Sequence, residues 1–119
     1  TFNIVVMEDY LAENRALVEA FLSAMIDAEA WMTDNREDAI TLVADAVGME
    51  RGDLAPIWDD YVFHVTLDQK QMDVLESHAR WRLDSGNHPP GATMPDFMEV
   101  IAPGPLMSVA PERVTLPGL

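Results

Sequence analysis

Three histidines have the widest chemical range of any side chains in this sequence, because imidazole can ligate a metal, relay a proton or hydrogen-bond as a neutral ring. They stand at His64, His78 and His88, too far apart for a short metal motif, and none belongs to an HExxH pattern. Asp59 and Asp60 are adjacent, and neighbouring residues on a helix point in different directions, so their spacing does not make a paired acid and base. The sequence therefore predicts structural or surface roles for these residues, with no metal, no cofactor and no enzymatic chemistry.

Other catalytic and phosphate-binding motifs are missing from the sequence as well. No serine lies in a GxSxG context, and neither GxGxxG nor GxxxxGK(S/T) occurs. The chain has no cysteine, which excludes disulfides, thiolate ligands and cysteine nucleophiles. Hydrolase and nucleotide-binding functions thus have no motif to support them.

Two aromatic residues, Trp58 and Tyr61, are the candidate ligand-binding residues. They lie where a short predicted helix, residues 54–60, passes into a predicted strand. Connections between elements often carry binding residues, and large aromatic side chains commonly line ligand pockets. Packing of the same side chains into the core is the competing interpretation, and the sequence leaves both open.

The charge balance restricts the partners. Twenty-one acidic residues stand against seven basic ones, a net charge of −14, so a nucleic-acid phosphate backbone would be repelled. The basic residues are scattered and form no polybasic cluster for an anionic membrane surface. The apolar runs are also far shorter than the roughly 20 residues that span a bilayer. The sequence predicts neither nucleic-acid binding nor a transmembrane helix.

Helices dominate the predicted elements. Over residues 14–32 apolar side chains recur every three or four positions, which predicts a helix with one apolar face. Asn35 is the expected N-cap of a second helix, and Gly48 its C-terminal stop. Asp68 is the expected N-cap of a third helix, which ends near residue 83.

Two or three short strands complete the expected fold class, which is mainly α. The β-branched run at residues 2–7 predicts a buried strand, and alternation over residues 61–67 predicts another. Residues 114–116 are a third candidate, at a sheet edge, within a proline-rich tail (about 87–119) expected to be irregular. So few strands do not complete a sheet unless they pair with one another beneath the helices or belong to a larger α/β architecture.

The order of the segments carries a resemblance to a known family. The chain reads NIVVMEDYLAENRALVEAFLSAMIDAEAWM, NREDAITLVADAVG, IWDDYVFHVTLD, LESHARWRLDSGN, MPDFMEVI and PLMSVAPERVTL. It resembles the C-terminal portion of the solute-binding proteins of ABC importers of the nitrate, sulfonate, taurine and thiamine-pyrimidine-precursor type. In that family a strand returns from the second lobe to the first and leads into a long helix, as residues 2–7 and Glu13, Asn14 and Arg15 do here.

The resemblance implies a two-lobed α/β protein that closes on a small molecule and presents it to a membrane permease. Residues 1–119 would form one C-terminal segment, with a hinge-return strand at about 2–7, helical cladding at about 12–84 and the irregular tail. It implies a location in the periplasm, or outside the cytoplasm on a lipid anchor, with the signal upstream of Thr1. In such a protein, Trp58 and Tyr61 would face the cleft between the lobes.

A second hypothesis belongs to another class. The sequence also fits a standalone acidic helical module whose methionine-rich face binds a protein partner or a second copy of itself. Under both hypotheses, exposed apolar surface could join two copies of this chain in a homodimer.

Overall fold

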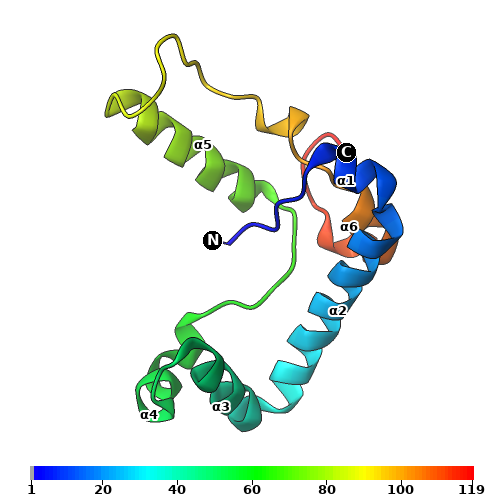
Figure 1. Ribbon diagram of the computed structural model, residues 1–119, viewed down its shortest axis with the longest axis vertical. Coiled ribbons are helices and arrows are strands. Elements are labelled where there is room, and N and C mark those ends of the chain that lie inside the picture. Colours follow the sequence, from blue (N-terminus) through cyan, green and yellow to red (C-terminus); the bar gives the residue numbers. More distant parts are fainter. Residues whose placement is uncertain (1) are drawn as a thin grey trace. The chain divides into compact units, whose positions relative to one another are not determined.

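The computed structural model describes residues 2–119 as two compact units of mainly helical structure (Figure 1). One unit contains the chain up to Glu19 together with Thr66–Leu119, and the other is Ala20–Val65. The mainly helical prediction is confirmed.

The first two helices follow one another closely. Helix α1, Glu8–Glu13, was not predicted, and its first-turn carboxylates Glu8 and Asp9 suit the positive end of the helix dipole. Helix α2, Arg15–Asp34, confirms the helix predicted over 14–32. Its apolar face is only partly covered, since Leu22 is the one buried residue of α2.

The unit Ala20–Val65 has a hydrophobic core formed by short helices. Helix α3, Arg36–Val47, is followed by α4, Arg51–Leu54, and by the 3-10 helix η1, Ala55–Asp60. Ile40 lies at the centre of this core and has no exposed surface. The buried cluster consists of Ala39, Ile40, Ala44, Leu54 and Trp58, with Met32, Val43 and Ala55 packed against it.

Both predicted ends of α3 are confirmed in position, but the Asn35 side chain does not make the expected capping hydrogen bond. Gly48 ends the helix in the left-handed conformation, with φ of 69°, as expected. Asn35 occupies the N-cap position, but its side chain accepts no hydrogen bond from the helix. Its amide instead donates to the Trp31 carbonyl oxygen at 2.9 Å, so Asn35 satisfies the end of α2.

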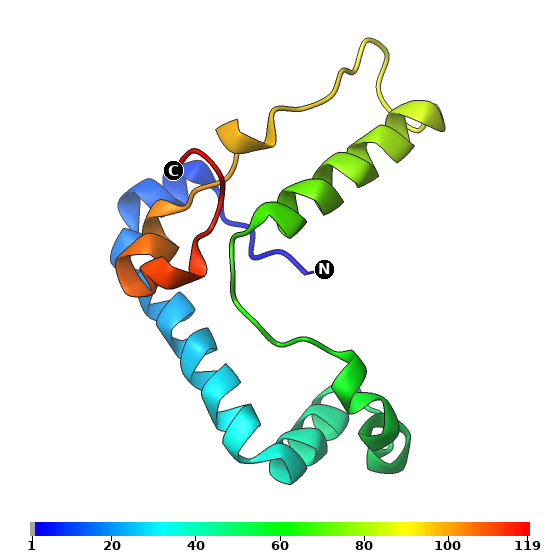
Figure 2. The same cartoon turned by 180° about the vertical axis from the view of Figure 1, so that it is seen from behind.

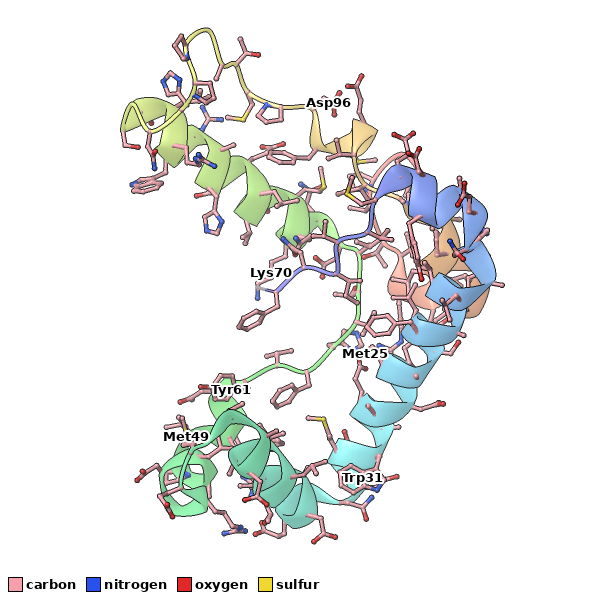
Figure 3. All side chains as sticks on the ribbon, in the orientation of Figure 1. Met25, Trp31, Met49, Tyr61, Lys70 and Asp96 are labelled. Carbon is pink, nitrogen blue, oxygen red and sulfur yellow. The ribbon has the colours of Figure 1, made fainter. Side chains whose placement is uncertain are left out.

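The other unit contains α5, Gln69–Asp84, and the segment that follows it. The Asp68 side chain accepts from the Gln71 backbone N–H at 3.0 Å, which confirms the predicted N-cap. After α5 the chain turns back through residues 85–96 and lies beside the helix in both views (Figure 1, Figure 2). It then enters the 3-10 helix η2, Phe97–Glu99, capped by Asp96, which Figure 3 labels.

The prediction of an irregular tail is wrong for part of its length. Helix α6, Gly104–Val109, and the 3-10 helix η3, Pro111–Arg113, both lie within it. Pro105 falls in the first turn of α6, where its missing N–H breaks no helical hydrogen bond, so the prolines did not prevent a short helix here. Leu106 and Leu116 are buried in this part of the chain.

The predicted strands do not form among the described residues. Residues 2–7 lack strand structure, and residues 61–67 pair only through one isolated parallel bridge, from Leu67 to Val114. At the bridge the Leu67 N–H donates to the Arg113 carbonyl at 2.9 Å, and the Thr115 N–H donates to the Leu67 carbonyl at 2.8 Å. An extended segment becomes a strand only when its backbone groups find a partner along their length, and local sequence carries no information about that partner.

Candidate functional site

A cleft of about 290 Å³ lies within the unit Ala20–Val65. Its walls come from the end of α2, the first residue of α3, the 3-10 helix η1 and the extended chain that follows η1. The lining residues are Glu29, Met32, Thr33, Arg36, Trp58, Asp59, Tyr61 and Phe63. Both candidate ligand-binding residues, Trp58 and Tyr61, therefore lie at one cleft.

Three aromatic rings form one wall of the cleft. The ring centroids of Trp58 and Phe63 are 4.9 Å apart, and those of Tyr61 and Phe63 are 6.1 Å apart with the rings stacked. Trp58 is 7% exposed and belongs to the core, so it combines packing with a place in the cleft wall. Tyr61, labelled in Figure 3 just after η1, is 47% exposed. Ligand contact by Trp58 and Tyr61 stays a prediction.

A charged rim borders the aromatic wall. The Arg36 Nη2 lies 3.1 Å from each carboxylate oxygen of Asp59, and Nη1 donates to Glu37 at 3.2 Å. Hydrogen bonding to Asp59, aided by the charges of Asp59 and Glu37, raises the pKa of the Arg36 guanidinium above its ordinary value. Glu37 is shared, because it also accepts from Arg51. The cation of the cleft is thus already paired with carboxylates.

Glu29 anchors the extended chain that carries two of the rings. Its carboxylate accepts from the Val65 backbone N–H, and its Oε2 lies 3.3 Å from His64 Nδ1. Only 13% of the Glu29 side chain is exposed. These contacts attach the end of the segment to α2 and so hold Tyr61 and Phe63 along the cleft.

The arrangement is suited to binding. Ring faces can stack on a flat or apolar solute, and the rim offers carboxylate oxygens as acceptors. The Thr33 hydroxyl, also in the lining, donates to the Glu29 carbonyl oxygen at 3.0 Å.

Sequence reasoning missed Glu29, Arg36 and Phe63 as parts of the site. Phe63 had a signal, since it follows Tyr61 by two residues in an alternating run and so shares its side of an extended chain. Glu29 and Arg36 had none, because their partners His64 and Asp59 are distant in the sequence.

The three histidines do not form a metal site among the described residues. His78 and His88 lie in the other unit, away from His64 in the sequence, and residues 2–119 contain no group of three metal-ligating side chains. Across the same residues no helix has both the length and the apolar character required to cross a bilayer.

Comparison of the chain with family models, with curated proteins and with solved structures finds no match.

Proposed function

We propose that this chain is the C-terminal portion of a solute-binding protein of an ABC importer, which captures a small molecule and delivers it to a membrane permease. The observation that supports the proposal most is the state of residues 2–7. Their composition is that of a buried strand, yet Phe2 is 99%, Val5 86% and Met7 76% exposed. The family that the sequence resembles places a strand in a sheet at this point.

The energetics favour a sheet for this segment. Burying one large apolar side chain contributes about 1.5–3 kcal/mol, so several such side chains in water represent a substantial unused stabilisation. Pairing within a sheet would also satisfy the backbone N–H and C=O groups of residues 3–6. In the proposed protein that sheet belongs to the lobe to which the strand returns.

The aromatic cleft is the part of the chain that we propose contacts the solute. Trp58 supplies a rigid wall because it is fixed in the core, and Tyr61 supplies an exposed ring with a hydroxyl group. The proposed protein acts in the periplasm, or outside the cytoplasm on a lipid anchor, and performs no covalent chemistry.

Hydrogen exchange on the native polypeptide tests the proposal. In the native polypeptide, the amides of residues 4–6 should be protected, whereas in the isolated 119-residue chain they should exchange freely. Ile40, at the centre of the α3 core, serves as the control and should be protected in both. Free exchange of residues 4–6 in the native polypeptide, or a native polypeptide that begins at Thr1, would contradict the proposal.

A second candidate function, a self-associating helical module, is favoured by the exposed apolar face of α2. Leu17 is 57%, Phe21 49% and Met25 39% exposed, and they follow one another at intervals of four residues. Such a stripe is typical of helices that pack on another helix. Sedimentation of the isolated chain at increasing concentration distinguishes a dimer from a monomer, and Phe21→Glu should abolish a dimer formed through this face.

A further inference from the structure

A second hollow, of about 320 Å³, lies between α5 and the chain that returns beside it. We call it the α5 hollow. One wall is the face of α5 whose apolar residues are half-buried. The other wall is the segment between Gly86 and η2. The apolar residues of the two walls are Leu75, Ala79 and Leu83 on α5 and Ala92, Pro95 and Phe97 opposite.

Polar groups lie at the rim of the α5 hollow. His78 and Arg82 stand one helical turn apart on α5, and both are exposed. The Arg82 Nε donates to the Asn87 carbonyl oxygen at 3.1 Å, which directs the guanidinium along the loop and leaves its two Nη groups outside that bond. No carboxylate of residues 2–119 pairs with Arg82, in contrast to Arg36 and its partner Asp59.

An arginine without a carboxylate partner is unusual in a chain with so many acidic residues. Acidic side chains outnumber basic ones by 21 to 7, yet none lines the α5 hollow. A guanidinium is always charged and presents a planar fork of N–H donors, which matches the two oxygens of a carboxylate. Arg82, which has no carboxylate partner and lies next to an apolar hollow, could pair with the carboxylate of a ligand whose apolar part fills the hollow.

We propose that the α5 hollow binds a small organic acid, a monocarboxylate with an apolar body. The carboxylate would lie at the rim on Arg82, with His78 as a further donor, and the apolar body would enter between Leu75, Ala79 and Phe97. A single arginine matches a single negative charge, and the size of the hollow is at the lower end of the range for ligand pockets, which favours a small ligand. The proposal is independent of the proposed solute-binding function, because no residue of the hollow lies in Ala20–Val65.

The probe is octanoate, titrated into the 15N-labelled chain and followed by amide chemical shifts. Saturable shifts are expected in α5 and in residues 87–97. Hexanoate should bind roughly 15-fold more weakly, because it lacks two CH₂ groups and each buried CH₂ changes affinity about fourfold. 1-Octanol has the same chain without the charge, and it should bind at least about tenfold more weakly than octanoate. Equal binding of octanoate and octanol, or shifts that do not saturate, would overturn the proposal.

Matched variants separate a site from general surface charge. Arg82→Gln should weaken octanoate binding at least about tenfold. Arg80→Gln removes the same charge from an exposed position of α5 that does not line the hollow, and it should change affinity less than about twofold. Equal effects of the two variants would show that octanoate responds only to net charge, and the proposal would be wrong.

A variant that fills the hollow keeps the test decisive if Arg82→Gln disturbs the loop through Asn87. Ala79→Met places a longer side chain in the hollow and leaves every charge in place, so octanoate binding should be lost. Ser77→Met adds the same side chain at an exposed position of α5 outside the hollow, and it should leave octanoate binding unchanged. Undiminished binding by Ala79→Met would contradict the proposal.

Discussion

Arg36 and Asp59 form a salt bridge in which one guanidinium nitrogen lies 3.1 Å from both carboxylate oxygens. The two residues are the first residue of α3 and the penultimate residue of η1. The bridge therefore joins the two elements at the rim of the cleft lined by Trp58, Tyr61 and Phe63.

Removing this salt bridge should have only a slight effect on stability. Asp59→Asn leaves Arg36 its bond to Glu37, and exposed ion pairs contribute little in water. The raised pKa of Arg36 means that its contribution is present at every pH below the ordinary arginine value and is lost only as pH rises beyond it. Stability should thus show no step from Arg36 between neutral pH and pH 10.

Thermal unfolding of Asp59→Asn beside Asp60→Asn checks this prediction. Asp60 is in no ion pair among the described residues, so it provides the matched loss of one charge. A large fall in melting temperature for Asp59→Asn alone would contradict the prediction.

Trp58 and Tyr61 should differ in what their loss does. Trp58→Ala should lower the free energy of unfolding by about 3–5 kcal/mol, because the ring is buried in the core. Tyr61→Ala should cost less than about 1.5 kcal/mol, because nearly half of that side chain is in water. In the proposed binding protein, Tyr61→Ala should instead weaken solute binding. Urea denaturation measures the change in the free energy of unfolding, and titration with the solute measures the change in affinity. Equal destabilisation by Trp58→Ala and Tyr61→Ala would contradict the prediction.

Substitution by alanine should change stability in opposite directions at two glycines. Gly48 has φ of 69° at the end of α3, a conformation that costs a residue with a Cβ about 1–2 kcal/mol, so Gly48→Ala should destabilise. Gly52 lies in α4 with open space around its Cα and no positive φ, so Gly52→Ala should stabilise by about 0.4–1 kcal/mol. Chemical denaturation of both variants provides the measurement, and each serves as the control for the other.

The N-cap of α5 should contribute more to the free energy of unfolding than an exposed charged residue of the same helix. Asp68→Ala removes the acceptor for the Gln71 N–H and should cost about 0.5–2 kcal/mol. Glu76→Ala, at an exposed position in the middle of α5, should change stability by less than about 0.5 kcal/mol. Circular dichroism during thermal unfolding compares the two, and an equal response would show that the cap contributes nothing.

Helices were predictable from the sequence because their information is local. The recurrence of apolar residues every three or four positions over residues 14–32 predicted α2. Gly48 predicted the end of α3, and Asp68 predicted the start of α5. The strands were not predictable in the same way, since a run such as residues 2–7 reports an apolar, extended preference and says nothing about the pairing partner.

The candidate site was predictable in part for the same reason. Trp58 and Tyr61 are close in the sequence, and their position at the end of a short helix identified them. The contacts of Glu29 with Val65 and of Arg36 with Asp59 depend on how the chain folds back on itself. No periodicity or motif encodes such contacts.

The division of the chain at Glu19 and Thr66 has a consequence for the order of folding. Ala20–Val65 is one continuous stretch of chain, whereas the other unit must first bring together two distant stretches, as in the bond from Arg15 to Ser108. The short helices around Ile40 should therefore assemble first and shorten the effective loop between those stretches. A protease cut inside Ala20–Val65 would remove that covalent tether, and the remaining unit would then become a two-piece complex whose survival depends on concentration.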